Sequence, residues 1–109
     1  SDHPKVALAL RYIAESANRR IKVNDVANAV ATNRRTLERK FREFTGRTIS
    51  QEISRMRIER AKRLMMESDL SFKELSAELG YRNSDHFYKS FLRAEGQTPS
   101  SFRIARIKN

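Results

Sequence analysis

Residues 33–46 read Asn-Arg-Arg-Thr-Leu-Glu-Arg-Lys-Phe-Arg-Glu-Phe-Thr-Gly, and this stretch decides the fold that we predict for the chain. Leu37, Phe41 and Phe44 recur at the spacing of one helical face, which predicts an amphipathic helix that packs by an apolar edge. The asparagine at the start can cap this helix, and the glycine at the end can adopt the left-handed conformation that closes it.

The other face of this predicted helix is basic. The stretch contains five Arg or Lys residues against two Glu, which gives it a net charge of +3. Arg35, Arg39 and Arg42 fall at i, i+4 and i+7, so they share a face. Such a face suits the major groove of DNA, but an ordinary helix with a solvated basic face gives the same pattern. This stretch alone leaves both interpretations open.

A second copy of the pattern follows about 50 residues later. Residues 41–50 and 91–100 share Phe, Gly, Thr and Ser at an offset of 50, and residues 21–30 and 70–79 share a hydrophobic pattern at an offset of 49. Each copy predicts a supporting helix, a short turn and a second helix, which we call the reading helix. The sequence therefore predicts a helix-turn-helix that occurs twice.

Local signals mark where further helices begin. They are a proline at a first position, capping boxes, and asparagine or threonine caps. These signals occur at Pro4, Thr48 with Gln51, Ser71 with Glu74, Asn83, and Thr98 with Pro99. The second reading helix is expected over residues 84–95, with Phe87 and Phe91 as its apolar edge. Its charges cancel, so it should bind DNA less strongly than the first.

We predict an all-α fold of about seven helices, in which two helix-turn-helix subdomains are joined by a long linker helix. The whole chain, residues 1–109, is interpreted as one DNA-binding domain. Its parts are a first subdomain at 1–47, the linker helix at 48–66 and a second subdomain at 67–109. A helix of about 18 residues is roughly 27 Å long. That length suits two reading helices that enter successive major-groove faces, about 34 Å apart.

The composition of the chain limits the classes of function that fit it. The formal net charge is +10 and the sequence pI is about 10.7, which indicates a polyanionic partner. RNA binding, non-specific nucleic-acid binding, or an anionic membrane surface for residues 49–66 are the alternatives. The chain has no cysteine and only two histidines, His3 and His86, far apart in sequence. We therefore expect no enzyme activity, no metal site and no cofactor.

One set of residues in the second copy and beyond it carries a specific resemblance. The set is Leu79-Gly80-Tyr81, Asn83, Phe87, Lys89, Phe91, Gly96, Thr98-Pro99 and Phe102-Arg103. It resembles the DNA-binding domain of the AraC/XylS family of bacterial transcription regulators, and the resemblance covers about residues 21–103. It implies seven helices, with base contacts from the outer faces of both reading helices.

The resemblance also implies which residues meet DNA. Base-reading residues, carried over by position, are Arg34, Arg35, Glu38, Arg39, Ser84, Asp85, His86 and Lys89. Basic residues expected at the DNA backbone are Arg20, Arg42, Arg82 and Arg93. Three positions depart from the family pattern: Lys22 at a capping position, Ser76 in place of alanine, and Asp85. A carboxylate at position 85 would be repelled by phosphates unless it accepts a hydrogen bond from a cytosine amino group or is held off the DNA.

The beginning of the chain is most similar to the xylose-operon activator branch of the family. We therefore expect sequence-specific binding of double-stranded DNA by a cytoplasmic transcription activator. The chain starts Ser-Asp-His-Pro without an initiator methionine, which we interpret as one piece of a longer protein. The effector is then expected to bind a domain absent from this chain. RNA polymerase is a candidate partner, and no membrane partner is expected.

Overall fold

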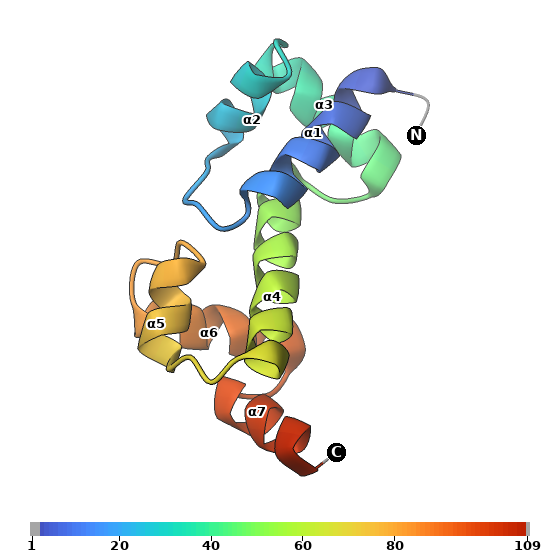
Figure 1. Cartoon of the computed structure of the whole chain (residues 1–109). Helices are drawn as coiled ribbons and strands as arrows, with labels where there is room; N and C mark the ends of the chain where they lie inside the picture. The colour runs from blue at the N-terminus through green and yellow to red at the C-terminus, as the bar shows by residue number, and fades with distance from the viewer. Residues whose placement is uncertain (1–2, 109) are drawn as a thin grey trace. The chain divides into compact units, whose positions relative to one another are not determined.

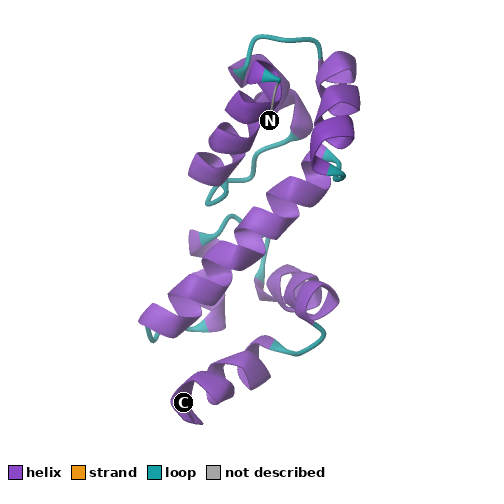
Figure 2. Cartoon of the chain, turned by 90° about the vertical axis from the view of Figure 1, so that its right-hand side faces the viewer, coloured by secondary structure: helices purple, strands orange, loops and turns teal. Residues whose placement is uncertain are grey.

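A computed structural model describes the backbone of residues 3–108 and the side chains of residues 3–105, and this part of the chain contains helices and no strand (Figure 2). The helices are α1 (Pro4–Ser16), α2 (Val23–Ala29), α3 (Arg34–Thr45), α4 (Ile49–Glu67), α5 (Phe72–Glu78), α6 (Ser84–Glu95) and α7 (Pro99–Lys108). The predicted all-α fold with seven helices is confirmed. In the described part, no helix is both long enough and apolar enough to cross a membrane.

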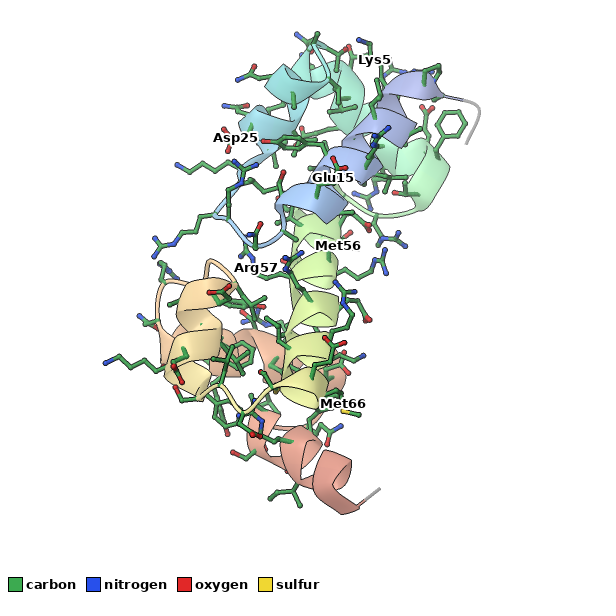
Figure 3. The ribbon with its side chains drawn as sticks, in the orientation of Figure 1. Lys5, Glu15, Asp25, Met56, Arg57 and Met66 are labelled. Atoms are coloured by element: carbon green, nitrogen blue, oxygen red, sulfur yellow. The ribbon has the colours of Figure 1, made fainter. Side chains whose placement is uncertain are left out.

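The chain packs as two compact units, residues 1–56 and 57–109, which we call the N-terminal and C-terminal units. The division falls inside α4, between Met56 and Arg57 (Figure 3). The first half of α4 thus contributes to one hydrophobic core and the second half to another. The three-part division made from the sequence stays a prediction.

In the N-terminal unit, α1, α2 and α3 pack together with the first half of α4 (Figure 1). The core takes apolar residues at helical spacing from each of these elements. They are Val6, Ala9, Ile13, Val23, Val26, Ala27, Val30, Leu37, Phe41, Ile49 and Ile53. At the edge of this core, the Lys5 ammonium donates a hydrogen bond of 2.6 Å to the Val30 carbonyl, which joins the start of α1 to the end of α2.

The predicted apolar edge of α3 is wrong for one residue, Phe44. Leu37 and Phe41 are fully buried, but Phe44 is 46% exposed. The buried stripe ends at Phe41 because the last turn of α3 extends past the core. There the ring of Phe44 meets the ring of His3, with 5.8 Å between the centroids.

The C-terminal unit is built around aromatic side chains from three helices. Phe87 lies between Phe72 of α5 and Phe91, with ring centroids 6.1 Å and 5.8 Å away. Phe91 in turn contacts Phe102 of α7, with 5.6 Å between the centroids. The second half of α4 closes this core with Ile58, Ala61 and Met65, and the supporting helix adds Leu75 and Leu79.

Both reading helices begin and end as the sequence predicted. The Asn33 side chain accepts a hydrogen bond from the Thr36 amide at the start of α3, and Asn83 does the same for the His86 amide at the start of α6. The glycines that close these helices, Gly46 and Gly96, have φ of 76° and 72°. A side chain would strain the backbone at these values of φ.

Two capping boxes are also confirmed, one at the start of α4 and one at the start of α5. Thr48 accepts from the Gln51 amide at 3.1 Å, and the Gln51 side chain accepts from the Thr48 amide at 2.8 Å. Ser71 and Glu74 make the same exchange at 3.1 and 2.9 Å. The hydrogen bonds from the Ser71 backbone and side chain hold the pKa of Glu74 below its usual range.

Polar contacts join the helices of the C-terminal unit. Arg103 of α7 donates to the Leu70 carbonyl at 2.5 Å, and its guanidinium lies 5.1 Å from the centroid of the Phe72 ring. Lys62 of α4 lies 3.1 Å from the Glu95 carboxylate at the end of α6, and this hydrogen bond raises the pKa of Lys62. These contacts hold α4, α6 and α7 in register around the aromatic core.

Two of the sequence departures have a local explanation. Ser76 is buried, but its hydroxyl donates a hydrogen bond of 2.7 Å to the Phe72 carbonyl, so the extra polar atom is satisfied within α5. Lys22 has no side-chain acceptor to offer as a cap. Instead, its backbone amide donates to the Asp25 carboxylate at 2.7 Å, which stabilises the start of α2 from inside the helix.

We predict that Phe91→Ala destabilises the protein by about 3–5 kcal/mol, because Phe91 is fully buried and contacts Phe87 and Phe102. Urea unfolding measures the change. Tyr88→Ala is the matched control, since Tyr88 lies on the same helix with 44% exposure and should cost much less. A Phe91→Ala variant that unfolds like the wild type but no longer binds DNA would mean that Phe91 faces the ligand.

Candidate nucleic-acid interface

The helices α3 and α6 are built to the same plan. Each has 12 residues, an asparagine cap and a glycine end. Each is anchored by two fully buried side chains one turn apart, Leu37 with Phe41 and Phe87 with Phe91. Helical geometry places the intervening position, 39 or 89, on the side opposite these anchors. That outward position is basic in both helices.

The outward face of α3 holds cations that are available to a ligand. Arg35 and Arg42 are exposed, and within the described part of the chain their guanidinium groups form no hydrogen bond or ion pair. A guanidinium in this state can pair with a phosphate or with a guanine edge without first breaking a contact within the protein. Arg35 was predicted to read bases and Arg42 to contact the DNA backbone.

Three other predicted base-reading residues of α3 are held by weak pairs. Arg34 donates to the Asn24 side chain at 3.1 Å and lies 3.5 Å from the Glu38 carboxylate. Arg39 lies 3.7 Å from Glu43. Exposed pairs of this kind are worth about 0.3–0.5 kcal/mol, so they orient these side chains and break readily when a ligand competes.

The equivalent face of α6 is different. Asp85 and Lys89 form an ion pair one turn apart, with 3.1 Å between Oδ2 and Nζ, and the two side chains are 70% and 67% exposed. Ser84, the first residue of the helix, is exposed beside them. The Asp85 carboxylate, which departs from the family pattern, is therefore neutralised by Lys89 on the same helix.

His86 is held at the start of α6. Its Nδ1 accepts a hydrogen bond of 3.2 Å from the Arg82 amide, and its ring stands edge-on to Tyr81 with 5.1 Å between the centroids. The ring is half-buried, so it contributes to the turn before α6 as well as to the outer face. In the described part of the chain, no group of three or more His, Cys, Asp or Glu side chains could hold a metal ion.

All four predicted backbone-contacting residues are exposed. Arg20 lies in the loop between α1 and α2, and Arg42 lies in the last turn of α3. Arg82 precedes α6, and Arg93 lies in its last turn. Each unit thus carries one such arginine at a loop and one near the end of its reading helix.

Sequence reasoning missed a buried carboxylate beside the first reading helix. Glu52 in α4 is 2% exposed, and it accepts from Arg47 at 2.6 Å and from Arg55 at 3.0 and 2.9 Å. Arg47 belongs to the turn that follows α3, so this network fixes how the chain leaves the reading helix. The signal was available, because Glu52 falls in the apolar stripe between Ile49 and Met56.

Burial alone would raise the pKa of Glu52. The hydrogen bonds from Arg55 and Arg47 and the two positive charges outweigh burial, so the pKa lies below its ordinary value of 4.5. Glu52 therefore stays ionised in the folded protein at neutral pH.

Comparison with known proteins decides what kind of domain this is. A family described as a helix-turn-helix domain matches residues 26–105. The xylose operon regulatory protein of Haemophilus influenzae is 38% identical over 101 residues, and its Escherichia coli K12 counterpart is 37% identical over 100 residues. These alignments cover 93% and 92% of this chain and 26% of each relative.

Solved structures agree. The DNA-binding domain of AdpA, in complex with a target DNA, matches with a TM-score of 0.87 and 28% identity, over 94% of this chain and 93% of that one. The xylose-binding transcription activator xylR matches with a TM-score of 0.87 and 35% identity, over 96% of this chain and 28% of that one. The chain belongs to the AraC family of DNA-binding domains.

Membership of the AraC family confirms several predictions. The chain is a sequence-specific DNA-binding domain of a transcription regulator, and the family is not enzymatic. The resemblance found in the sequence, including its xylose-operon branch, is confirmed by the two relatives above. The chain spans about a quarter of the length of these curated relatives. The individual base-reading and backbone-contacting residues remain predictions.

We predict that acid destabilises the N-terminal unit through Glu52. Because its pKa is lowered on folding, the ionised carboxylate stabilises the fold above the ordinary value of 4.5, and this contribution is lost as the pH falls through the folded-state pKa. Glu52→Gln should be less stable at neutral pH and should lose less stability on acidification. Urea unfolding between about pH 3 and pH 7 measures both effects.

Glu15→Gln provides the control, since Glu15 is a 66% exposed carboxylate on α1. The free energy of unfolding of Glu15→Gln should depend on pH as that of the wild type does. Identical pH dependence in Glu52→Gln and the wild type would show that the buried carboxylate contributes nothing to acid sensitivity.

Proposed function

We propose that this domain binds one asymmetric site on duplex DNA, with α3 and α6 as reading helices in successive major grooves. The observation that carries the proposal is the common plan of these helices: the same caps, the same two buried anchors and a basic residue at the same outward position. A helix docked by one edge with its polar face free is what the major groove accepts.

In this proposal the outward side chains read bases and the flanking arginines contact phosphates. Arg34, Arg35, Glu38 and Arg39 act in the first half-site, and Ser84, Asp85, His86 and Lys89 act in the second. Arg20, Arg42, Arg82 and Arg93 contact the DNA backbone. The continuous α4, with 19 residues and a length of roughly 28 Å, is proposed to space the two helices about one turn of DNA apart.

The xylose operon relatives suggest the setting. We propose that the domain serves a longer, sugar-responsive transcription activator in the bacterial cytoplasm, whose effector binds outside this chain. RNA polymerase is the proposed partner at the promoter. In terms of the sequence divisions, residues 1–47 and 67–109 are the two reading subdomains and residues 48–66 the linker.

Selection of bound sites from random duplex DNA tests the function directly. The expected result is a defined sequence whose duplex competes far better than scrambled DNA or matched RNA at moderate salt. Equal competition by all three would favour the alternative, a basic helical module that binds nucleic acid without sequence preference.

We predict that Arg39→Ala weakens binding to the selected site by about 1–3 kcal/mol and relaxes preference at one base position, because a bidentate contact to guanine is lost. Arg42→Ala is the matched comparison on the same helix. It should weaken all duplexes alike and reduce the salt slope by about one, as expected for a phosphate contact. Fluorescence anisotropy with a panel of single-base variants separates the two. If Arg39→Ala weakens binding to every duplex equally, Arg39 contacts the DNA backbone, as Arg42 is predicted to do.

We further predict that inserting about 5 base pairs between the half-sites abolishes simultaneous binding, because half a helical turn moves one half-site to the other side of the duplex. Affinity should fall to that of the first half-site alone, since α3 has the larger positive charge. Inserting a full turn of about 10 base pairs is the control for length. Unchanged affinity with the half-turn insertion would mean that only one helix reads DNA or that the linker bends.

A further inference from the structure

The two reading helices carry opposite charges at their second residue. Counted from their asparagine caps, Arg35 of α3 and Asp85 of α6 occupy the same place, and Arg39 and Lys89 occupy the next outward place. The guanidinium of Arg35 has no hydrogen bond or ion pair within the described residues, whereas Asp85 pairs with Lys89 at 3.1 Å. The second reading helix therefore presents a joined anion and cation where the first presents two cations.

This ion pair points to solvent and not to the protein core. Both side chains are at least two-thirds exposed, and they lie opposite the buried anchors Phe87 and Phe91. An exposed pair one helical turn apart contributes only about 0.3–0.5 kcal/mol to stability, so folding alone gives little reason for it.

We propose that Asp85 and Lys89 together read one C·G base pair in the major groove. The inference rests on the proposed function, in which α6 enters that groove. Cytosine presents its N4 amino donor there, and guanine presents the acceptors O6 and N7 beside it. The Asp85 carboxylate accepts from N4, while the Lys89 ammonium donates to O6 or N7.

The order of groups along the groove favours C·G over A·T. In C·G the donor stands at one end of the row, next to two acceptors, so an anion and a cation 3.1 Å apart each find a partner. In A·T the adenine N6 donor lies between two acceptors, N7 and the thymine O4, with the thymine methyl beyond. A carboxylate placed at N6 would meet an acceptor on either side.

Pairing also explains how a carboxylate can approach DNA. A lone anion in the groove is repelled by phosphates on both strands, but Lys89 cancels that charge locally. The pair therefore adds discrimination without adding net attraction. The half-site read by α6 would contribute mainly specificity, while the unpaired arginines of α3 contribute mainly affinity.

The experiment is a double-mutant cycle on the selected duplex, with Asp85→Asn, Lys89→Gln and the double variant. Each single variant should reduce the preference for C·G at the same base pair of the second half-site by roughly 5- to 150-fold. The double variant should lose no more than the larger single effect, because the two side chains act as a unit.

An exposed ion pair elsewhere supplies the control. Arg11 and Glu15 also lie one turn apart on their helix, α1, with 3.6 Å between Nε and Oε2. Their side chains are 74% and 66% exposed. Glu15→Gln should change neither affinity nor base preference. Thermal unfolding checks that the α6 variants remain folded, which their exposure leads us to expect.

Other outcomes would overturn the inference in distinguishable ways. If Asp85→Asn tightens binding to all duplexes equally, Asp85 only repels phosphates, and the inference fails while the proposed function stands. If the two variants relax different base pairs, the side chains read separately. If neither variant changes base preference while Arg39→Ala does, α6 does not read this site. A wild-type protein that binds all duplexes equally would instead contradict the proposed function.

Discussion

The docking of each reading helix through two fully buried side chains is the constraint on which the rest of the structure depends. Leu37 and Phe41 do this in α3, and Phe87 and Phe91 do it in α6. Two anchors one turn apart fix the rotation of a helix about its own axis, and therefore which residues point outward. The capping asparagine and closing glycine fix its length, so the outward positions follow from a few apolar side chains.

Most of this could be predicted from the sequence because it depends on local rules. Caps and helical periodicity depend on neighbours within four residues, so the bounds of α6 were predicted to the residue. Phe44 was predicted wrongly because periodicity does not report where the neighbouring helices end. Glu52 was missed because polarity predicts exposure. Arg55 lies one turn away on the same helix, but Arg47 reaches the carboxylate from the turn before α4. The pairing of Asp85 with Lys89 likewise depends on side-chain geometry.

Charge has two uses in this domain. Acidic residues hold the framework: Glu52 fixes the turn after α3, and Glu95 receives Lys62 where α6 ends. Arg35 and Arg42 have no such partner within the described part of the chain. The net charge of +10 then gives a general attraction to DNA, whereas the arrangement of unpaired and paired side chains determines which sequence is preferred.

The repeated plan also explains how one chain can recognise an asymmetric site. Both helix-turn-helix copies keep the anchors and the helix ends, since a change there alters the orientation of the whole helix. The outward positions are free of that constraint, and there the copies diverge, with Arg35 in one and Asp85 in the other. Substitution on an exposed face costs little stability, so the bases that are read can change without disturbing the fold. A frame that is held by buried contacts thus leaves specificity to a few solvent-facing residues.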